Sequence, residues 1–101
     1  MLFVHGGIIP NIPIEKQTKD VLLWDRDLIT YAKTNIIQPY KRVFIGHTST
    51  QIIANDLQHT TPIRYNNLIM LDCGVGWSGK LCIMNIDTEK YWLSKKQKPA
   101  I

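Results

Sequence analysis

A short stretch of sequence, RVFIGHT at residues 42–48, decides the fold class. Three apolar side chains are followed at once by glycine and histidine, which is typical of a buried strand that ends in a loop. The same design opens the chain, where LFVHGG occupies residues 2–7. Sites collect at the carboxyl ends of strands in α/β folds, so His5 and His47 are candidate site residues. Each histidine taken alone is more often a hydrogen-bonded structural residue.

Helical patterns precede and follow the second predicted strand along the chain. Thr18 or Asp20 can cap a helix over residues 21–24, and a second helical pattern covers residues 28–32. A third helix, through residues 51–54, follows the histidine of the second strand. Gly46 and its counterpart near the first histidine permit unusual dihedral angles and a close approach of the backbone.

The last part of the chain reads as strands. Short apolar runs at residues 63–65, 68–71, 81–86 and 91–94 predict three or four strands, and residues 87–90 predict a hairpin turn. The predicted order is strand, helices, strand, helix and then an antiparallel meander. The sequence therefore predicts an α/β fold in a single unit.

Composition and charge fit one ordinary globular domain. The chain has 101 residues, of which 45% are hydrophobic and 20% charged, and its formal net charge is +4. Part of the excess lies in the tail at Lys95, Lys96 and Lys98, and we expect residues 95–101 to be a frayed, solvated basic end. Nucleic-acid binding is the weaker alternative, because no aromatic residues interleave a basic groove.

The cysteine usage and hydropathy indicate a cytoplasmic protein. Cys73 and Cys82 match neither a metal motif nor a disulfide framework, so we expect two reduced thiols, although the sequence does not exclude a bridge. No apolar run approaches the roughly 18 residues of a membrane span, and no signal peptide is evident. We expect no membrane partner.

Four motifs in order carry a resemblance to a known family. They are FVHGGI with Pro10 at residues 3–10, LLWDRD at 22–27, FIGHT at 44–48, and LDCG with GKL at 71–81. Together they resemble the C-terminal half of the calcineurin-like metallophosphatases. The similarity is greatest to bacterial and phage serine/threonine protein phosphatases and the related diadenosine tetraphosphatases. The resemblance implies part of a β-sandwich flanked by helices.

The resemblance also implies roles for three residues. His5 and His47 would be ligands of one of two divalent metal ions, Mn²⁺, Fe or Zn²⁺, that activate a water for attack on phosphorus. Arg26 would grip the substrate phosphate, as a planar guanidinium can. The alternative for Arg26 is a surface ion pair with Asp25 or Asp27.

Other polar and aromatic residues are expected to be structural. Asp72 follows a strand end, and a hydrogen bond that it would accept from a ligand histidine is the less favoured alternative. His59 lies in a polar loop and is expected to be solvated. The three tryptophans are expected to pack rather than to bind substrate. They are Trp24, Trp77 and Trp92.

The family's other metal motifs are absent from the sequence. It contains no Gly-Asp-x-His-Gly, no Gly-Asp-x-x-Asp-Arg-Gly and no Gly-Asn-His-Glu. Residues 1–101 therefore read as a partial domain that begins midway. We expect it to be inactive alone, to expose apolar surface, and to need an N-terminal half or self-association.

Several functions stay open at this point. The leading hypothesis is a phosphoric monoester hydrolase acting on a phosphorylated protein or a small phosphoester. Dinucleoside polyphosphate hydrolysis is a close rival. A non-catalytic remnant that binds another chain is a third. A small structural zinc protein is disfavoured, because such sites are closed by four protein ligands.

Overall fold

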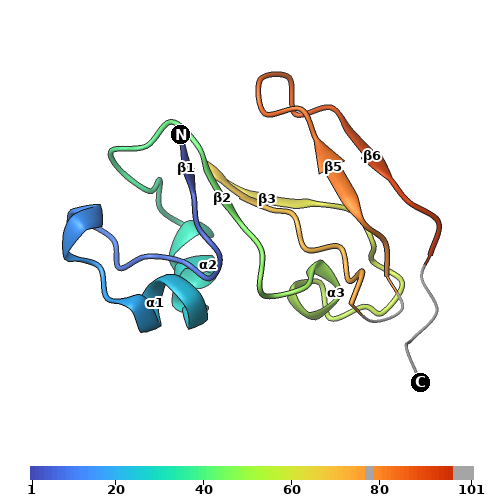
Figure 1. Cartoon of the computed structure of the whole chain (residues 1–101), viewed down its shortest axis with the longest axis horizontal. Helices are drawn as coiled ribbons and strands as arrows, with labels where there is room; N and C mark the ends of the chain where they lie inside the picture. The colour runs from blue at the N-terminus through green and yellow to red at the C-terminus, as the bar shows by residue number, and fades with distance from the viewer. Residues whose placement is uncertain (77–78, 97–101) are drawn as a thin grey trace.

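The computed structural model describes residues 1–76 and 79–96, in which strands and short helices alternate in the first part and only strands follow (Figure 1). The strands are β1 (Leu2–Phe3), β2 (Val43–Ile45), β3 (Ile63–Tyr65), β4 (Leu68–Met70), β5 (Cys82–Met84) and β6 (Tyr91–Leu93). The four-stranded sheet has the order β1-β2-β4-β3, with β1, β2 and β4 parallel and β3 antiparallel to β4. A separate antiparallel pair joins β5 to β6. This arrangement confirms the α/β class.

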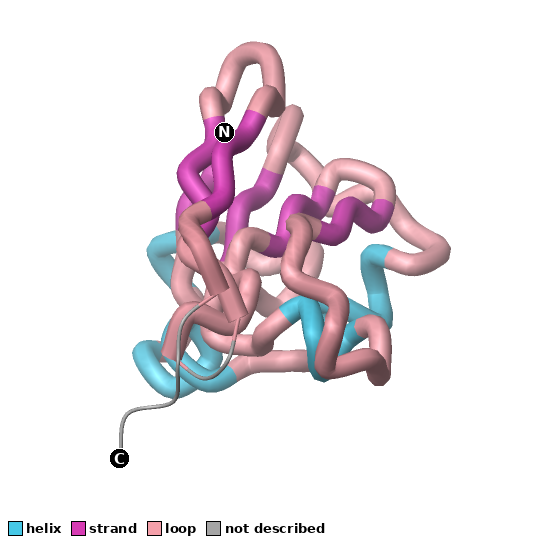
Figure 2. Tube along the Cα trace, turned by 90° about the vertical axis from the view of Figure 1, so that its right-hand side faces the viewer, coloured by secondary structure: helices cyan, strands magenta, loops and turns pink. Residues whose placement is uncertain are grey.

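Short helices connect the parallel strands, and local capping explains where they begin. The helices are η1 (Ile14–Lys16), α1 (Lys19–Trp24), α2 (Asp27–Ala32) and α3 (Thr50–Ile53). Thr18 accepts from Val21 N at the start of α1, as the sequence predicts. Ser49 does the same for α3. The helices lie mostly below the strands in Figure 2.

The core lies between α2 and one face of the four-stranded sheet. Every second residue of the paired strands points toward the helix, because side chains alternate across a strand. Leu28 and Ala32 of α2 pack there against the strands. The strand residues of this face are Leu2, Val4, Val43, Ile45, Ile63, Tyr65, Leu68 and Met70. Together they form the hydrophobic centre that holds β1, β2 and β4 in register.

The opposite face of the sheet carries a second apolar layer. Phe3 stacks on Phe44 with ring centroids 4.8 Å apart, and Ile69 is the partner of Phe44 on β4. Phe44 and Ile69 are buried, whereas Phe3 on the edge strand is 57% exposed. The β5–β6 hairpin therefore leaves the β1 end of this face open.

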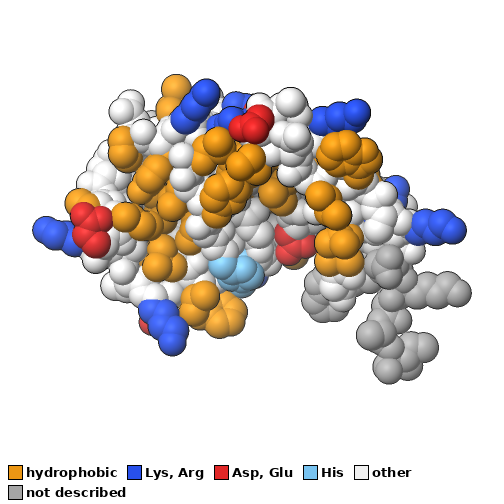
Figure 3. All heavy atoms as spheres, turned by 45° about the horizontal axis from the view of Figure 1, so that its top comes forward, with side chains coloured by type: hydrophobic (Ala, Val, Ile, Leu, Met, Phe, Trp, Pro, Cys, Tyr) orange, Lys and Arg blue, Asp and Glu red, His pale blue; other side chains and the backbone are white. Residues whose placement is uncertain are grey.

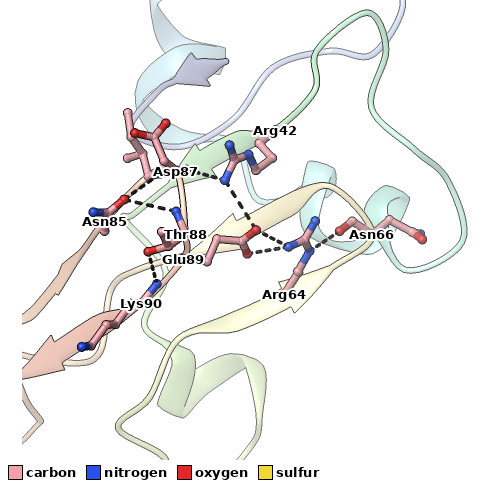
Figure 4. A network of polar contacts seen from close by, with 9 residues as sticks. Arg42, Arg64, Asn66, Asn85, Asp87, Thr88, Glu89 and Lys90 are labelled. Carbon is pink, nitrogen blue, oxygen red and sulfur yellow. Dashed lines mark hydrogen bonds and ion pairs between the residues drawn. The ribbon is translucent and has the colours of Figure 1, made fainter.

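Glu89 fastens the hairpin to the sheet (Figure 4). Its carboxylate accepts two hydrogen bonds from Arg64 Nη1, both 2.5 Å, and lies 3.5 Å from Arg42 Nη1. Arg42, which is buried, also donates to the carbonyl of Ile86 in the hairpin turn. One acidic residue thus connects the turn to both β2 and β3, because Arg42 immediately precedes β2.

The predicted continuous meander is wrong. β3 and β4 pair as expected, but the chain then leaves the sheet, and β5 and β6 pair only with one another. The segment between β4 and β5 makes hydrogen bonds within itself instead. Gly79 N donates to Gly74 O and Lys80 N donates to Cys73 O, both at 2.9 Å. The predicted strand at 81–86 is correspondingly shorter, covering Cys82–Met84.

The end of the chain is only partly described. Lys96 Nζ donates to Gln58 Oε1 at 3.3 Å, so this lysine has a partner rather than lying free. Residues 97–101, including Lys98 of the expected frayed tail, and Trp77 lie outside the described residues. Within residues 1–76 and 79–96, the structure contains no helix of the length and apolarity that a membrane span requires.

Candidate functional site

A glycine at the end of β1 places His5 beside the first two helices. Gly6 N donates to the carbonyl of Leu22 at 2.7 Å. A Cβ on Gly6 would lie 2.8 Å from the carbonyl carbon of Leu23, closer than any side chain tolerates. Only glycine lets the loop approach α1 so closely. The HGG motif therefore serves to seat His5 against the junction of α1 and α2.

His47 sits in a tight turn at the end of β2. Its φ is +64°, and Thr48 N donates to Gly46 O at 2.7 Å, the i to i+2 bond of a γ-turn. Such a backbone is uncommon for a residue with a Cβ and is a form of strain found at functional sites. The sequence suggested that the glycine would take the unusual dihedral, but the histidine takes it. A Cβ on Gly46 would meet no atom within 4 Å.

The structure brings His5 and His47 together. Their ring centroids lie 4.9 Å apart with an interplanar angle of 53°. The two residues follow β1 and β2, which are neighbouring parallel strands, so both loops emerge at the same edge of the sheet. His5 is exposed and His47 half-buried. Nε2 of His47 is buried and has no hydrogen-bond partner.

The surroundings of His47 favour its neutral form. Burial lowers the pKa of the imidazole, the charges of Arg26 and His5 lower it further, and Asp72 acts in the opposite direction. The Trp24 ring also makes an edge contact with His47, with centroids 5.4 Å apart. A neutral imidazole with a free nitrogen is the form that binds a metal ion or accepts a proton.

Arg26 is a cation whose charge acts on His47. Its Nε donates to Thr48 Oγ1 at 3.0 Å, across the gap between α2 and the turn that holds His47. Asp25 is engaged elsewhere, since its carboxylate accepts from Leu28 N at 3.0 Å and caps α2. The bond to Thr48 uses Nε and so orients the guanidinium group. The two terminal amino groups take no part in this bond.

Asp72 supports the site from the β4 side. Its carbonyl accepts from Thr50 N at 2.7 Å, and its side chain accepts from Gly74 N at 3.0 Å. These bonds fix the start of α3 and the loop after β4. The carboxylate acts on His47 through space, as the upward contribution to the pKa of that histidine shows.

An open cleft of about 640 Å³ lies beside the two histidines. It lies on the second face of the sheet, between the ends of β1 and β2 and the start of β5. Hydrophobic side chains gather on this surface beside a histidine (Figure 3). The lining includes Phe3, Phe44, Leu71, Val75, Leu81 and both cysteines, together with the polar groups of His5, His47, Asp72 and Lys80.

Three expectations about individual residues change. His59 is half-buried rather than fully solvated, and its Nε2 lies 3.2 Å from Thr61 Oγ1. Trp24 is 65% exposed and Trp92 54% exposed, so neither is a core residue. Trp24 instead borders the histidine pair. Trp24 lies beside His47 because of the turn that presents the histidine ring. A tryptophan in a helical pattern gives no sequence signal of that contact.

The donor set fits a metal ion as one part of a ligand shell. His5 and His47 supply two imidazole nitrogens, which suit Mn²⁺, Fe and Zn²⁺. Over residues 1–76 and 79–96, no cluster of three or more His, Cys, Asp or Glu side chains is arranged to hold a metal. A metal ion held by this pair would need further ligands to complete its shell.

Comparisons with protein families, with curated proteins and with solved structures give no match to this chain. The interpretation of the site rests on its residues and their geometry. Three features carry it: the paired histidines, the unpartnered nitrogen of His47, and the anchored arginine.

Proposed function

We propose that this chain forms one side of a metal-dependent phosphoesterase site, of the serine/threonine protein phosphatase type that its motifs resemble. In this proposal the described sheet is the C-terminal half of a metallophosphatase sandwich. The observation that carries it is the pairing of His5 and His47 at 4.9 Å, with a buried, unpartnered Nε2 on His47.

The two histidines and the arginine would have separate roles, in metal binding and in phosphate binding. A divalent metal pair would supply the nucleophilic hydroxide and the Lewis acid, with His5 and His47 among its ligands. Arg26, held through Nε by Thr48, would present its terminal N–H groups to phosphoryl oxygens and offset their negative charge. The apolar walls of the cleft would exclude water and strengthen these charge interactions only once a partner covers the open side.

Two substrate classes compete within this activity. A phosphorylated serine or threonine peptide is the leading substrate, and a dinucleoside polyphosphate is the alternative. The described side of the site supports both, because Arg26 would recognise the phosphoryl group that they share.

The chain's three histidines provide a direct test of metal binding. Histidine ring protons can be followed in a proton NMR spectrum, and Mn²⁺ broadens signals of nearby nuclei. We expect substoichiometric Mn²⁺ to broaden His5 and His47 and to spare His59. The His5→Asn, His47→Asn and His59→Asn variants assign the signals, and asparagine suits His47 because it tolerates a positive φ.

The same variants supply the control. His47→Asn should abolish selective broadening at His5, whereas His59→Asn should leave the His5 and His47 response unchanged. Equal broadening of all three rings, or none at millimolar Mn²⁺, would show that the pair alone has no selective affinity for metal. The same result in the presence of a polypeptide that carries the missing motifs would overturn the proposal.

Turnover tests the phosphoesterase part separately. We expect the chain alone to hydrolyse p-nitrophenyl phosphate with Mn²⁺ no faster than the His47→Asn variant. Addition of a polypeptide carrying the Gly-Asp-x-His-Gly, Gly-Asp-x-x-Asp-Arg-Gly and Gly-Asn-His-Glu motifs should produce activity that requires His47. Failure to do so while metal binding persists would leave a metal-binding, non-catalytic protein.

The exposed apolar surface favours assembly as part of this function. Phe3 at the edge of the sheet and the cross-strand pair of Ile83 and Trp92 on the outer side of the hairpin are all exposed. Burying such groups is worth roughly 25 cal/mol per Å². The partner would be an N-terminal half or a second copy of the chain.

A further inference from the structure

The two cysteines meet at the wall of the cleft. Cys73 is buried and lies just after β4, whereas Cys82 is half-buried and begins β5. Both side chains line the same cleft. The backbone joins the segments that carry them, because Lys80 N donates to Cys73 O at 2.9 Å and Gly74 is bridged to Lys80. The thiols are close enough for Cys82 to raise the pKa of Cys73.

We propose that Cys73 and Cys82 are a redox-modification site, at which a low-molecular-weight disulfide such as glutathione disulfide converts the thiol pair into an intramolecular disulfide. Both cysteines are reduced in the structure. The inference does not depend on phosphoesterase activity, because it concerns the connection between the loop after β4 and the hairpin.

The chemistry proceeds by thiol–disulfide exchange. The Cys82 thiolate attacks one sulfur of glutathione disulfide, forms a mixed disulfide and releases one glutathione thiolate. The Cys73 thiolate then attacks Cys82 Sγ, closes the bridge and expels the second glutathione thiolate. Two cysteine thiols are oxidised, one glutathione disulfide is reduced to two thiols, and the two cysteine protons pass to solvent or to the departing thiolates.

The order of attack follows from exposure. Cys82 is the more accessible cysteine, so the bulky disulfide reaches it first. Burial raises the pKa of both thiols, and together with the neighbouring Cys82 it raises that of Cys73 to about 12, so the more exposed Cys82 remains the first to attack. Once the mixed disulfide has formed, ring closure is intramolecular and has the advantage of proximity.

The bridge would hold the hairpin at a second point. Glu89 already fastens the turn between β5 and β6 to Arg42 and Arg64. A Cys73–Cys82 bond would fasten the opposite end of β5 to the loop after β4. The cleft wall formed by Leu81 and Cys82 would then be covalently fixed at its distance from Asp72 and the histidines.

A peptide map provides the test. The reduced protein is incubated with glutathione disulfide, alkylated, denatured and digested with trypsin without reduction. Cleavage after Arg64, Lys80 and Lys90 separates Cys73 in peptide 65–80 from Cys82 in peptide 81–90. We expect these peptides as one cross-linked species, and an intact monomer lighter by two hydrogens. The melting temperature should rise by roughly 10 °C and return to its original value on reduction.

Controls separate native proximity from chance reaction. Cys82→Ser should give neither the cross-link nor the melting shift. At neutral pH, where both thiols are protonated in either state, the bridge should be at least about tenfold more favourable at equilibrium with glutathione in the folded protein than in denaturing urea. A lasting glutathione adduct without ring closure, cross-links between chains, or equal equilibrium constants in folded and unfolded protein would each overturn the proposal.

Discussion

Arg26 Nε donates a hydrogen bond to Thr48 Oγ1 across 3.0 Å, and this bond ties the start of α2 to the residue that follows His47. The donor is exposed and the acceptor is buried. The buried hydroxyl of Thr48 therefore orients the flexible side chain of Arg26. It also makes Thr48 a residue whose replacement changes Arg26 without touching either histidine.

Thr48→Val should release Arg26 while preserving the shape of the buried side chain. We expect the Nε proton of Arg26 to exchange with solvent faster in an NMR measurement. The free energy of unfolding should fall by about 1 kcal/mol, the typical net value of one such bond. Thr48→Ser retains the hydroxyl and should keep the slow exchange. Equal exchange in all three proteins would show that the bond does not persist in solution.

Asn67 is expected to be among the most sensitive polar residues. Its buried amide accepts from Ile37 N and donates to Ile37 O, both at 2.8 Å, and also donates to Tyr40 O. Asn67→Ala leaves these buried backbone groups without partners, so it should lower the free energy of unfolding by about 3 kcal/mol. Urea unfolding followed by circular dichroism measures the change.

The control for that variant is Asn35→Ala. Asn35 also bonds backbone, through Tyr31 O, but in an exposed position where water can replace it. We expect a change below about 0.5 kcal/mol. Similar losses in both variants would mean that the Asn67 bonds carry no special weight.

Glu89→Gln should loosen the hairpin. The substitution keeps the size of the side chain but removes the charge that Arg42 and Arg64 share. We expect stability to fall by roughly 1–3 kcal/mol, because buried Arg42 loses its counter-charge. Amide exchange at Asn85 and Ser94 should accelerate more than exchange at Leu71 in the sheet connection. Uniform acceleration at all three amides would point to a global effect instead.

Alkaline pH should destabilise the fold through Cys73. Its pKa is raised to about 12 in the folded protein from an ordinary value near 9, chiefly by burial. A raised pKa means that the folded state holds the proton more tightly, so the associated stability is complete below pH 9 and is lost as pH rises toward 12. The urea midpoint should therefore fall more steeply over this range in the wild type than in Cys73→Ala. Parallel pH profiles would contradict the assignment.

Phe3 is expected to govern self-association. The side chain is exposed on the open end of the sheet face, so Phe3→Thr should shift size-exclusion elution toward the monomer and lower the binding of a hydrophobic dye. Ile36→Thr is a matched control, because Ile36 is 59% exposed but does not line the cleft. A wild type that elutes as a monodisperse monomer and binds no dye would contradict the prediction.

The features that sequence predicts here are those set by neighbours along the chain. Apolar runs that end at His5 and His47 identify two strands, and Thr18 is one of the two residues that the sequence offers as the first helix cap, because each signal is local. The parallel pairing of β1 with β2 then brings the two histidines to one edge.

The features that sequence missed depend on distant partners. The departure of β5 from the sheet is accompanied by the contact of Glu89 with Arg42, 47 positions earlier in numbering. The positive φ of His47 is set by its turn and its packing against Trp24, although glycine beside it offered the usual signal. Neither arrangement produces a hydrophobic periodicity in the sequence from which it could be predicted.

The edge formed by β1 has a consequence for how the sheet can grow. Leu2 N and Val4 N both donate into β2, to Arg42 O and Phe44 O. Successive peptide groups alternate in direction along a strand, so Phe3 turns its own N–H and carbonyl outward. A guest strand could therefore extend the sheet by backbone pairing at this rim. It would cover the phenylalanine ring and bring its own side chains alongside His5.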